Sequence, residues 1–353
     1  MRPGNARSPK FKRVIVTRPG GPEVLQLREE ALPEPGPGEV RVKILATGVS
    51  YADLLMREGV HPETPRTVPF TLGWDLAGVV DKTGAGVSRF TPGQRVGALP
   101  VTGGYAQFIC LPQEELVLVP AGLDPAEVVC LVFNYMTAYQ MMHRAARVQP
   151  GQRVLIHAAS GGIGTALLQL GRVAGLEMYG TASAAAHERV TALGATPIDY
   201  KHVDFVEEIR RLTGDGVDVV FDGMGGSHLW RSVRALRAGG TVVAYGLTSS
   251  LSGGQLARGR RYRFHGLAVF GLIQAATRLI PGGRRMRFYS VQRLKRRRPG
   301  WYQEDLTVLL DLLRQGKIQP IIAARLPLEE AARAHELLGR GGVTGKIVLL
   351  CDT

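Results

Sequence analysis

Residues 153–170 read RVLIHAASGGIGTALLQL. The stretch predicts a buried strand over 153–158 that runs through a glycine turn into a helix over 162–174. Gly161 and Gly164 occupy the second and third glycine positions of a G-x-G-x-x-G pattern, and an alanine replaces the first glycine. A dinucleotide pyrophosphate needs backbone N–H groups at a helix N-terminus, with no side chain where the backbone meets the phosphate. The stretch therefore favours a dinucleotide-binding turn over a purely structural one.

The residues around this turn alternate between helix and strand patterns. Beyond the first strand and helix, expected strands cover 177–181, 197–199, 217–222 and 241–245, and expected helices cover 124–143, 184–193, 205–212 and 228–236. Such alternation is the signature of βαβ units in a doubly wound parallel sheet. We therefore expect an α/β chain with a Rossmann dinucleotide-binding domain over 126–303.

The first 125 residues have a different rhythm. Short β-branched or alternating segments at 40–46, 77–82, 95–99 and 105–111 are separated by Gly/Pro turns, which predicts a β-rich domain. The chain ends in two helical stretches, 305–315 and 328–338, and a strand over 345–350. We expect this ending to return to the first domain, which would then be discontinuous and comprise 1–125 and 304–353.

Composition narrows the classes of protein. The 353 residues contain no run of 18 apolar, uncharged residues, and the start of the chain has no apolar segment typical of a signal peptide or anchor. We expect no membrane contact and a cytoplasmic location. Cys110, Cys130 and Cys351 are widely spaced without a C-x-x-C pair, so each is expected to be a small core residue rather than part of a disulfide framework or zinc site.

The positive charge of the chain is concentrated in one stretch. The formal net charge is +14, and thirteen Lys or Arg residues with no Asp or Glu lie between Arg258 and Arg298. The rest of the chain is close to neutral. We expect a basic insert over 258–298, either a solvated loop or interface rim, or a surface that receives an anionic carrier.

The end of the second strand indicates which dinucleotide binds. NAD-binding domains usually carry Asp or Glu there to bind the ribose diol. Here the strand ends in Thr181-Ala182-Ser183 without a carboxylate, and basic side chains, among them His187, follow closely. These residues favour NADPH over NADH, because a 2′-phosphate would meet no repulsion. The alternative is that the basic side chains are a solvated helix face.

Together these residues resemble the medium-chain dehydrogenase/reductase superfamily, in its zinc-free quinone oxidoreductase and enoyl reductase branch. The resemblance covers nearly the whole chain and rests on the glycine turn and on six further motifs: YADL with REG at 51–59, PFTLGWD at 69–75, PGQRV at 92–96, GGYA at 103–106, NYMTAY at 134–139 and GKIV at 345–348. It implies that the β-rich domain is a GroES-like catalytic domain. It also implies a homodimer.

The resemblance implies a set of cofactor-binding residues. They contact the nicotinamide, the pyrophosphate or the 2′-phosphate in this family, and they are Thr137, Ser160, Gly161, Gly162, Ile163, Gly180, Ser183, His187, Tyr200, Tyr245, Gly246, Thr248 and Lys346. His187 stands where relatives often have a phosphate-binding Lys. Since a neutral imidazole attracts phosphate less than an ammonium does, this departure weakens the argument for NADPH.

Zinc-dependent members of the superfamily carry a catalytic Cys, a Gly-His-Glu motif and a cysteine-rich loop. This chain has Ser50 and Tyr51 near the first position and Gly73-Trp74-Asp75 at the second, so no metal is expected. The expected reaction is hydride transfer from NADPH to a quinone or to the β-carbon of an enone. Tyr51 is the candidate catalytic proton donor, with a wall of the substrate pocket as its alternative role. Asp53 is expected to be structural, and His61, His143 and His157 to be packing or surface residues.

Two other functions stay possible from the sequence. The basic insert fits an enoyl-thioester reductase that acts on a substrate bound to coenzyme A or to an acyl carrier protein. A non-catalytic NADPH-binding protein that binds nucleic acid or another partner is the second. Nucleic acid is the weaker option, because the insert lacks repeated aromatic residues for base stacking.

Overall fold

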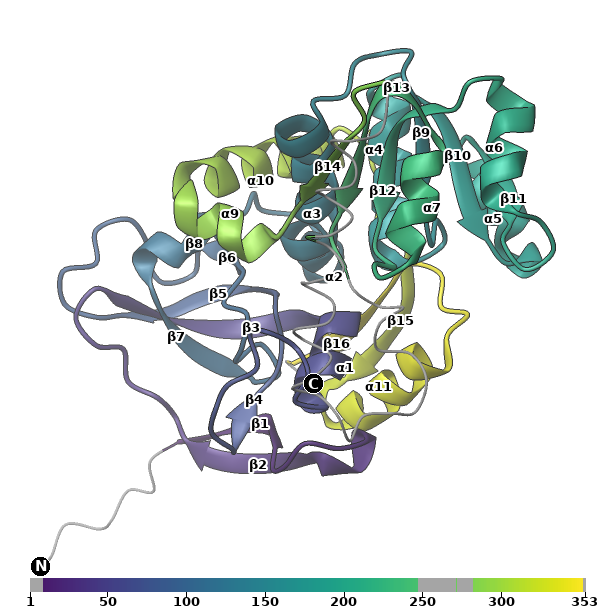
Figure 1. Ribbon diagram of the computed structural model, residues 1–353. Coiled ribbons are helices and arrows are strands. Elements are labelled where there is room, and N and C mark those ends of the chain that lie inside the picture. Colours follow the sequence, from purple (N-terminus) through teal and green to yellow (C-terminus); the bar gives the residue numbers. More distant parts are fainter. Residues whose placement is uncertain (1–8, 247–270, 272–281, 352–353) are drawn as a thin grey trace, which may run out of the picture. The chain divides into compact units, whose positions relative to one another are not determined.

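The computed structural model describes residues 9–246, 271 and 282–351 of the chain (Figure 1). These residues form two compact units. Unit 1 comprises Met1–Phe133, Ile322–Gly342 and Lys346–Thr353, and unit 2 comprises Asn134–Ile321 and Val343–Gly345. Among the described residues, no helix is long and apolar enough to cross a membrane.

Unit 1 is rich in β-structure, as the segments of the first 125 residues predict. Its strands are β1 (Lys10–Val16), β2 (Leu25–Ala31), β3 (Glu39–Val49), β4 (Phe70–Thr71), β5 (Leu76–Thr83), β6 (Arg95–Ala98), β7 (Phe108–Pro112), β8 (Leu116–Leu118), β15 (Ile322–Pro327) and β16 (Lys346–Leu350). Its helices are α1 (Tyr51–Arg57), α2 (Pro125–Cys130) and α11 (Ala331–Arg340), with single 3₁₀ turns η1 (Pro22–Val24), η2 (Gln113–Glu115) and η8 (Leu328–Glu330).

One long strand organises unit 1. The largest sheet has the order β15-β16-β3-β5-β6-β8, and β7 also pairs with β3. The sequence of β3 is EVRVKILATGV, and its apolar side chains are buried except Leu45, which is half-buried. A second sheet of order β2-β1-β4 completes the β-structure described here. The chain returns from unit 2 through β15 and β16, and β16 pairs antiparallel with β3, so unit 1 is discontinuous.

Unit 2 alternates between strands and helices (Figure 1). Its strands are β9 (Arg153–Ile156), β10 (Glu177–Ala182), β11 (Ala195–Asp199), β12 (Val217–Asp222), β13 (Leu236–Ala244) and β14 (Arg285–Phe288). Its helices are α3 (Met136–Gln140), α4 (Gly162–Val173), α5 (His187–Ala192), α6 (Phe205–Thr213), α7 (His228–Arg234), α9 (Val291–Arg297) and α10 (Pro299–Arg314), with a 3₁₀ turn η5 (Ala184–Ala186). Two π-helical segments, η3 (Leu131–Tyr135) and η4 (Met141–Ala146), flank α3.

The sheet of unit 2 is parallel throughout, in the order β11-β10-β9-β12-β13-β14. The strand order therefore reverses direction between β9 and β12, as in doubly wound dinucleotide-binding sheets. Leu155, Tyr179 and Val220 point to one face, where they pack in a core with α6 and α7. Met178 points to the other face, where it touches Gly171 of α4. Helices thus cover both faces of the sheet.

Helix α10 packs within unit 2, although the sequence assigns residues from 304 onward to the other domain. Asp305 of α10 accepts a hydrogen bond from Gln140 Nε2 at 2.9 Å and one from Arg144 Nη2 at 2.7 Å. The return to unit 1 occurs at Ile322, and unit 1 extends to Phe133 rather than 125. A helical pattern shows that a helix has an apolar face but not which surface covers that face.

The buried carboxylate of Asp305 should contribute strongly to the stability of unit 2. We expect Asp305→Asn to lower the free energy of unfolding by about 1.5–3 kcal/mol, because the hydrogen bond to the Arg144 guanidinium loses its charge. Asp311→Asn on the same helix is the matched control, since Asp311 forms an exposed pair with Arg314 and little change is expected. Urea unfolding measures both. Equal losses in the two variants would contradict this account of α10.

Candidate functional site

The glycine turn links β9 to α4 as the sequence predicts. Residues 157–160 form the turn, and Gly161 is the N-cap of α4. No side chain caps the helix, and its first turn contains no acidic residue. The first N–H groups of a helix have no intrahelical acceptor. The start of α4 therefore presents polar backbone groups that suit an anion.

The three glycines of the turn differ in what surrounds them. A Cβ on Gly162 would lie 2.3 Å from Asn134 Nδ2, and one on Gly164 would lie 2.3 Å from the Ala158 carbonyl oxygen. Packing against backbone therefore requires glycine at 164, whereas a side chain at 162 would have to displace the end of the Asn134 side chain. Gly161 has an ordinary φ of −73°, and a Cβ there would meet only the Ala158 oxygen, at 3.3 Å. Gly161 is therefore the least crowded of the three glycines, which fits the close approach of a pyrophosphate.

Ala158 adopts the left-handed conformation, with a φ of +52°. This conformation costs a residue other than glycine about 1–2 kcal/mol. The Ala158 carbonyl accepts a hydrogen bond from Gly161 N–H at 3.0 Å, so the orientation of the Ala158 peptide shapes the turn. The neighbouring Ser160 carbonyl accepts one from Gly345 N–H, also at 3.0 Å. Ile163 is the second residue of α4.

The predicted phosphate-binding residues lie after β10 and β11. Gly180 is buried in β10, where a Cβ would contact Ala159 and Val190. Ser183 precedes η5, and His187 begins α5 with a buried Nε2 that has no hydrogen-bond partner. Tyr200 is 53% exposed after β11.

One carboxylate lies on the strand beside this cluster. Asp199 of β11 is level with Ala182 at the end of β10. Hydrogen bonds from the His202 side chain and the Lys201 backbone N–H hold the pKa of Asp199 below its usual range. Sequence reasoning placed no carboxylate at the end of β10, which is correct, but it did not consider the neighbouring strand.

The loops after β12 and β13 lie against each other. Tyr245 follows β13, and its ring covers Gly223, where a Cβ would lie 2.9 Å from Cζ. A Cβ on Gly246 would lie 2.3 Å from the Gly223 oxygen. The predicted residues Tyr245 and Gly246 thus follow a strand of the same parallel sheet that carries the glycine turn and Gly180. Thr137 is buried on α3 of this unit. Thr248 and most of the basic insert, 258–270 and 272–281, lie outside the described residues.

Lys346 and Tyr51 belong to unit 1, whereas the other predicted site residues that the structure describes belong to unit 2. The Lys346 ammonium is buried and lies 2.7 Å from Asp75 Oδ2. Gly48 N–H donates to the other oxygen of Asp75 at 2.8 Å. Asp75 belongs to the Gly73-Trp74-Asp75 segment, which stands where zinc-dependent members of the superfamily have Gly-His-Glu. Trp74 donates its indole N–H to Met56 Sδ at 3.1 Å and stacks on Phe133.

Ser50 and Asp53 fix the start of α1. Ser50 is the N-cap and accepts from Asp53 N–H, while the Asp53 carboxylate accepts from the backbone and hydroxyl of Ser50. The second oxygen of Asp53 accepts from Gly73 N–H at 3.0 Å. Asp53 is therefore structural, as expected, and it holds the helix that begins with Tyr51. Ser50, Trp74 and Asp75 are all committed to contacts within unit 1.

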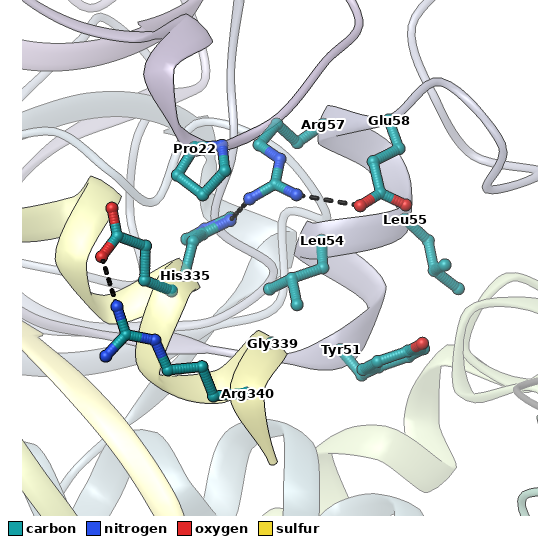
Figure 2. A pocket seen from close by; sticks show the side chains of 10 residues that line it. Pro22, Tyr51, Leu54, Leu55, Arg57, Glu58, His335, Gly339 and Arg340 are labelled. Carbon is teal, nitrogen blue, oxygen red and sulfur yellow. Dashed lines mark hydrogen bonds and ion pairs between the residues drawn. The ribbon is translucent and has the colours of Figure 1, made fainter. Parts of the chain in front are cut away.

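A pocket of about 330 Å³ adjoins Tyr51 in unit 1 (Figure 2). Its charged side chains are paired with one another, Arg57 with Glu58 and Arg340 with Glu336. The pocket therefore does not select an anion. The Tyr51 side chain is 40% exposed. Partial burial of this side chain raises the pKa of Tyr51 above its usual value, and the charge of Glu58 adds a smaller effect. The Tyr51 hydroxyl is therefore protonated at neutral pH and can donate a hydrogen bond or a proton.

Sequence reasoning missed a polar cluster in unit 2. His157, Asp222 and His228 have nitrogen or oxygen atoms within 4.8 Å of one another, and among the described residues they are the group that could hold a metal ion. The partners of His157 are far away in the sequence, so spacing gave no signal. The signal available was a polar residue at the end of two apolar segments, His157 directly after β9 and Asp222 as the last residue of β12.

Comparisons with known proteins agree with this arrangement. Residues 36–121 match the family described as alcohol dehydrogenase GroES-like domain, and residues 193–349 match zinc-binding dehydrogenase. The chain is 34% identical over 340 residues to human synaptic vesicle membrane protein VAT-1 homolog, covering 92% of this chain and 82% of the relative. It is 34% identical over 351 residues to 2-haloacrylate reductase from a Burkholderia species, covering 95% and 98%. The structure of Escherichia coli quinone oxidoreductase complexed with NADPH aligns with a TM-score of 0.81 at 27% identity, covering 96% and 99%.

Asp53 should make stability depend on pH. Burial raises the pKa of Asp53 to about 7, against the effect of its hydrogen bonds from Ser50. Folding then favours the protonated carboxyl, so its contribution is fully present below about pH 4 and is lost as the pH rises to about 7. We expect the unfolding free energy of wild type to fall relative to Asp53→Asn over that range, by at most about 1.4 kcal/mol per pH unit. Denaturant titrations at each pH measure the difference, and parallel curves would show that Asp53 is ionised throughout.

Proposed function

Because the chain belongs to the zinc-free quinone oxidoreductase branch of the medium-chain dehydrogenase/reductase superfamily, we propose that it is an NADPH-dependent reductase that transfers a hydride to a quinone or to the β-carbon of an α,β-unsaturated carbonyl compound. The expected fold class is confirmed: a GroES-like β-rich domain accompanies a Rossmann-type parallel sheet. The observation that carries the proposal is the N-terminus of α4 at Gly161, the least crowded glycine of the turn, with no side-chain cap and no acidic residue in its first turn.

The cofactor assignment is supported by the residues at the strand ends. The glycine turn lies beside the point where strand order reverses, which is where doubly wound sheets bind dinucleotides. Ser183, His187 and Tyr200 are proposed to surround the 2′-phosphate, since the end of β10 carries no carboxylate and His187 Nε2 is buried without a partner. The related E. coli structure contains NADPH.

The protein's part in the reaction is to bind, orient and protonate. NADPH supplies the hydride when it is bound. Gly161, Gly162 and Ile163 are proposed to hold its pyrophosphate, while Thr137, Tyr245 and Gly246 border the nicotinamide. Lys346 is held by Asp75, so its proposed contribution near the nicotinamide comes through its backbone. The Tyr51 hydroxyl is proposed to donate a proton to the reduced product, with solvent as the alternative donor.

The substrate class follows from what the relatives' names share. A quinone and a 2-haloacrylate both carry an electron-poor carbon conjugated to a carbonyl group, and these are the names of two similar proteins. A thioester carried by coenzyme A or an acyl carrier protein is a second candidate. It is favoured by exposed arginines at the described end of the basic insert, Arg285, Arg287, Arg296 and Arg297. A homodimer stays a prediction, for which β14, the last strand of this sheet among the described residues, offers a pairing strand.

The test is a panel of acceptors with both dinucleotides. Quinones, enones, 2-haloacrylates and enoyl thioesters are reduced with NADPH and NADH in parallel, and calorimetry measures dinucleotide binding. We expect NADPH to bind and to reduce at least one quinone or enone. Turnover of thioesters alone, suppressed by salt, would favour the carrier-bound substrate. No uptake of either dinucleotide would end the proposal.

Gly164→Ala tests the turn in the same assay. The new methyl group would lie 2.3 Å from the Ala158 oxygen and must push α4 away from β9. We expect NADPH to bind at least about tenfold more weakly, a loss of about 1.4 kcal/mol. Gly300→Ala is the control, because a Cβ there meets nothing within 4 Å. Unchanged affinity in Gly164→Ala would remove this turn from the binding site.

Tyr51→Phe separates its two proposed roles. Loss of a positioned proton donor should lower kcat for enones by about 10²-fold, the low end of general acid catalysis, and leave the dissociation constant of NADPH unchanged. Steady-state kinetics and calorimetry give the two numbers. A phenylalanine that raises KM without lowering kcat would make Tyr51 a wall of the pocket instead.

A further inference from the structure

Three neighbouring strands of unit 2 have polar residues at the same level, at or next to their carboxyl ends. Leu155 of β9 pairs with Tyr179 of β10 and with Val220 of β12. Two residues further along each strand are His157, Thr181 and Asp222. Side chains two apart share a face of a sheet, so all three follow the apolar core side chains that pack against α6 and α7. All three are buried.

The hydrogen bonds of Asp222 fix the direction of its neighbours' protons. Asp222 Oδ1 accepts from the backbone N–H groups of Met224 and Gly225, at 2.7 and 3.0 Å. Its Oδ2 accepts from the Ser232 hydroxyl at 2.6 Å and lies 3.0 Å from His228 Nδ1. Burial opposes ionisation, but the hydrogen bonds and nearby imidazoles hold the pKa of Asp222 below its usual range. Asp222 is therefore an acceptor only.

The tautomer of His157 follows from this. Ser232 gives its one proton to Asp222, so its oxygen accepts from His157 Nε2, 3.1 Å away. Burial lowers the pKa of His157 to about 3, so the ring is neutral and only Nε2 carries a proton. His157 Nδ1 then accepts from the Thr181 hydroxyl at 3.1 Å. Every donor in the chain points toward the carboxylate.

The far end of this chain is the strained residue of the glycine turn. Thr181 Oγ1 accepts from Ala158 N–H at 3.3 Å. Ala158 has a φ of +52°, and its carbonyl bonds to Gly161 N–H and abuts Gly164. The conformation of Ala158 therefore connects the hydrogen-bond chain to the residues proposed to hold the pyrophosphate.

We propose that Thr181, His157, Ser232 and Asp222 form a positioning chain that holds Ala158 in the left-handed conformation and so presets the glycine turn for NADPH. The inference rests on the proposed function, since it concerns the same cofactor site. The four residues act through Ala158 and touch no reacting atom. They set the affinity for the cofactor rather than the chemistry of hydride transfer.

The same residues could instead bind a metal ion through His157, Asp222 and His228. The hydrogen bonds argue against this, because His157 Nε2 faces the Ser232 oxygen and both Asp222 oxygens already accept two hydrogen bonds each. A stoichiometric divalent ion that survives chelation and is lost in His228→Ala would overturn the proposal.

A double-mutant cycle tests it. Thr181→Val keeps the shape of the side chain but removes the hydroxyl, and we expect NADPH to bind about tenfold more weakly, or about 1.4 kcal/mol. Ala158→Gly makes the left-handed conformation accessible without help. In that background Thr181→Val should change the affinity by less than about twofold. Thr181→Ser keeps the hydroxyl and should therefore bind NADPH as tightly as wild type. Thr196→Val, at an exposed position of β11, is the matched control.

The outcomes separate this inference from the proposed function. Wild-type protein that binds no NADPH refutes the function itself. If wild type binds NADPH, two results refute the positioning chain: Thr181→Val leaves the affinity unchanged, or it weakens the affinity equally in the wild-type and Ala158→Gly backgrounds. The second result would indicate a general loss of stability, which Ala158→Gly would not rescue. If Thr181→Val does not fold, Ser232→Ala takes its place with the same expected coupling. Nitrogen-15 shifts of His157 in wild type should show the Nε2–H tautomer, and the Nδ1–H form would also refute the proposal.

Discussion

The close approach of α4 to the end of β9 is the constraint on which unit 2 depends. Gly164 lies so near the Ala158 carbonyl that no side chain fits between them, and Gly162 lies against the end of the Asn134 side chain. These contacts fix the helix axis relative to the strand. Once it is fixed, the first N–H groups of α4 lie at the end of β9 beside Gly161, where the pyrophosphate is proposed to bind.

The sequence predicted this part of the molecule well because the signals are local. A buried strand, a glycine turn and a helix follow one another within 18 residues, and the parallel sheet follows from their repetition. Long-range contacts were less accessible. The helix around Asp305 had a clear pattern, but its packing on Gln140 and Arg144 depends on residues some 160 positions away. His157 is a buried packing residue as expected, but its hydrogen-bond partners were not foreseen for the same reason, since Thr181 and Ser232 lie 24 and 75 residues on.

In unit 1, the positions that hold zinc ligands in zinc-dependent members of the superfamily have structural roles instead. Ser50 caps α1, Trp74 packs between Met56 and Phe133, and Asp75 binds the Lys346 ammonium. A buried ion pair of this kind is costly to break, because removal of one partner leaves an uncompensated charge. It also ties the last strand, β16, to the strand that follows Trp74. Ser50, Trp74 and Asp75 are therefore used for contacts that hold unit 1 together, whereas ligands of a metal ion would have to be free of such contacts.

The two sets of buried polar residues differ in what they stabilise. Asp75 and Lys346 neutralise each other inside unit 1, and they link β16 to the residue that precedes β5. In unit 2 the chain from Asp222 to Thr181 ends on a backbone N–H in a conformation that alanine disfavours. Part of the free energy of those hydrogen bonds is therefore spent on holding the turn in one shape before any ligand arrives. A turn that is already ordered loses less entropy on binding, so strain stored at Ala158 and affinity at Gly161 are linked through the same peptide.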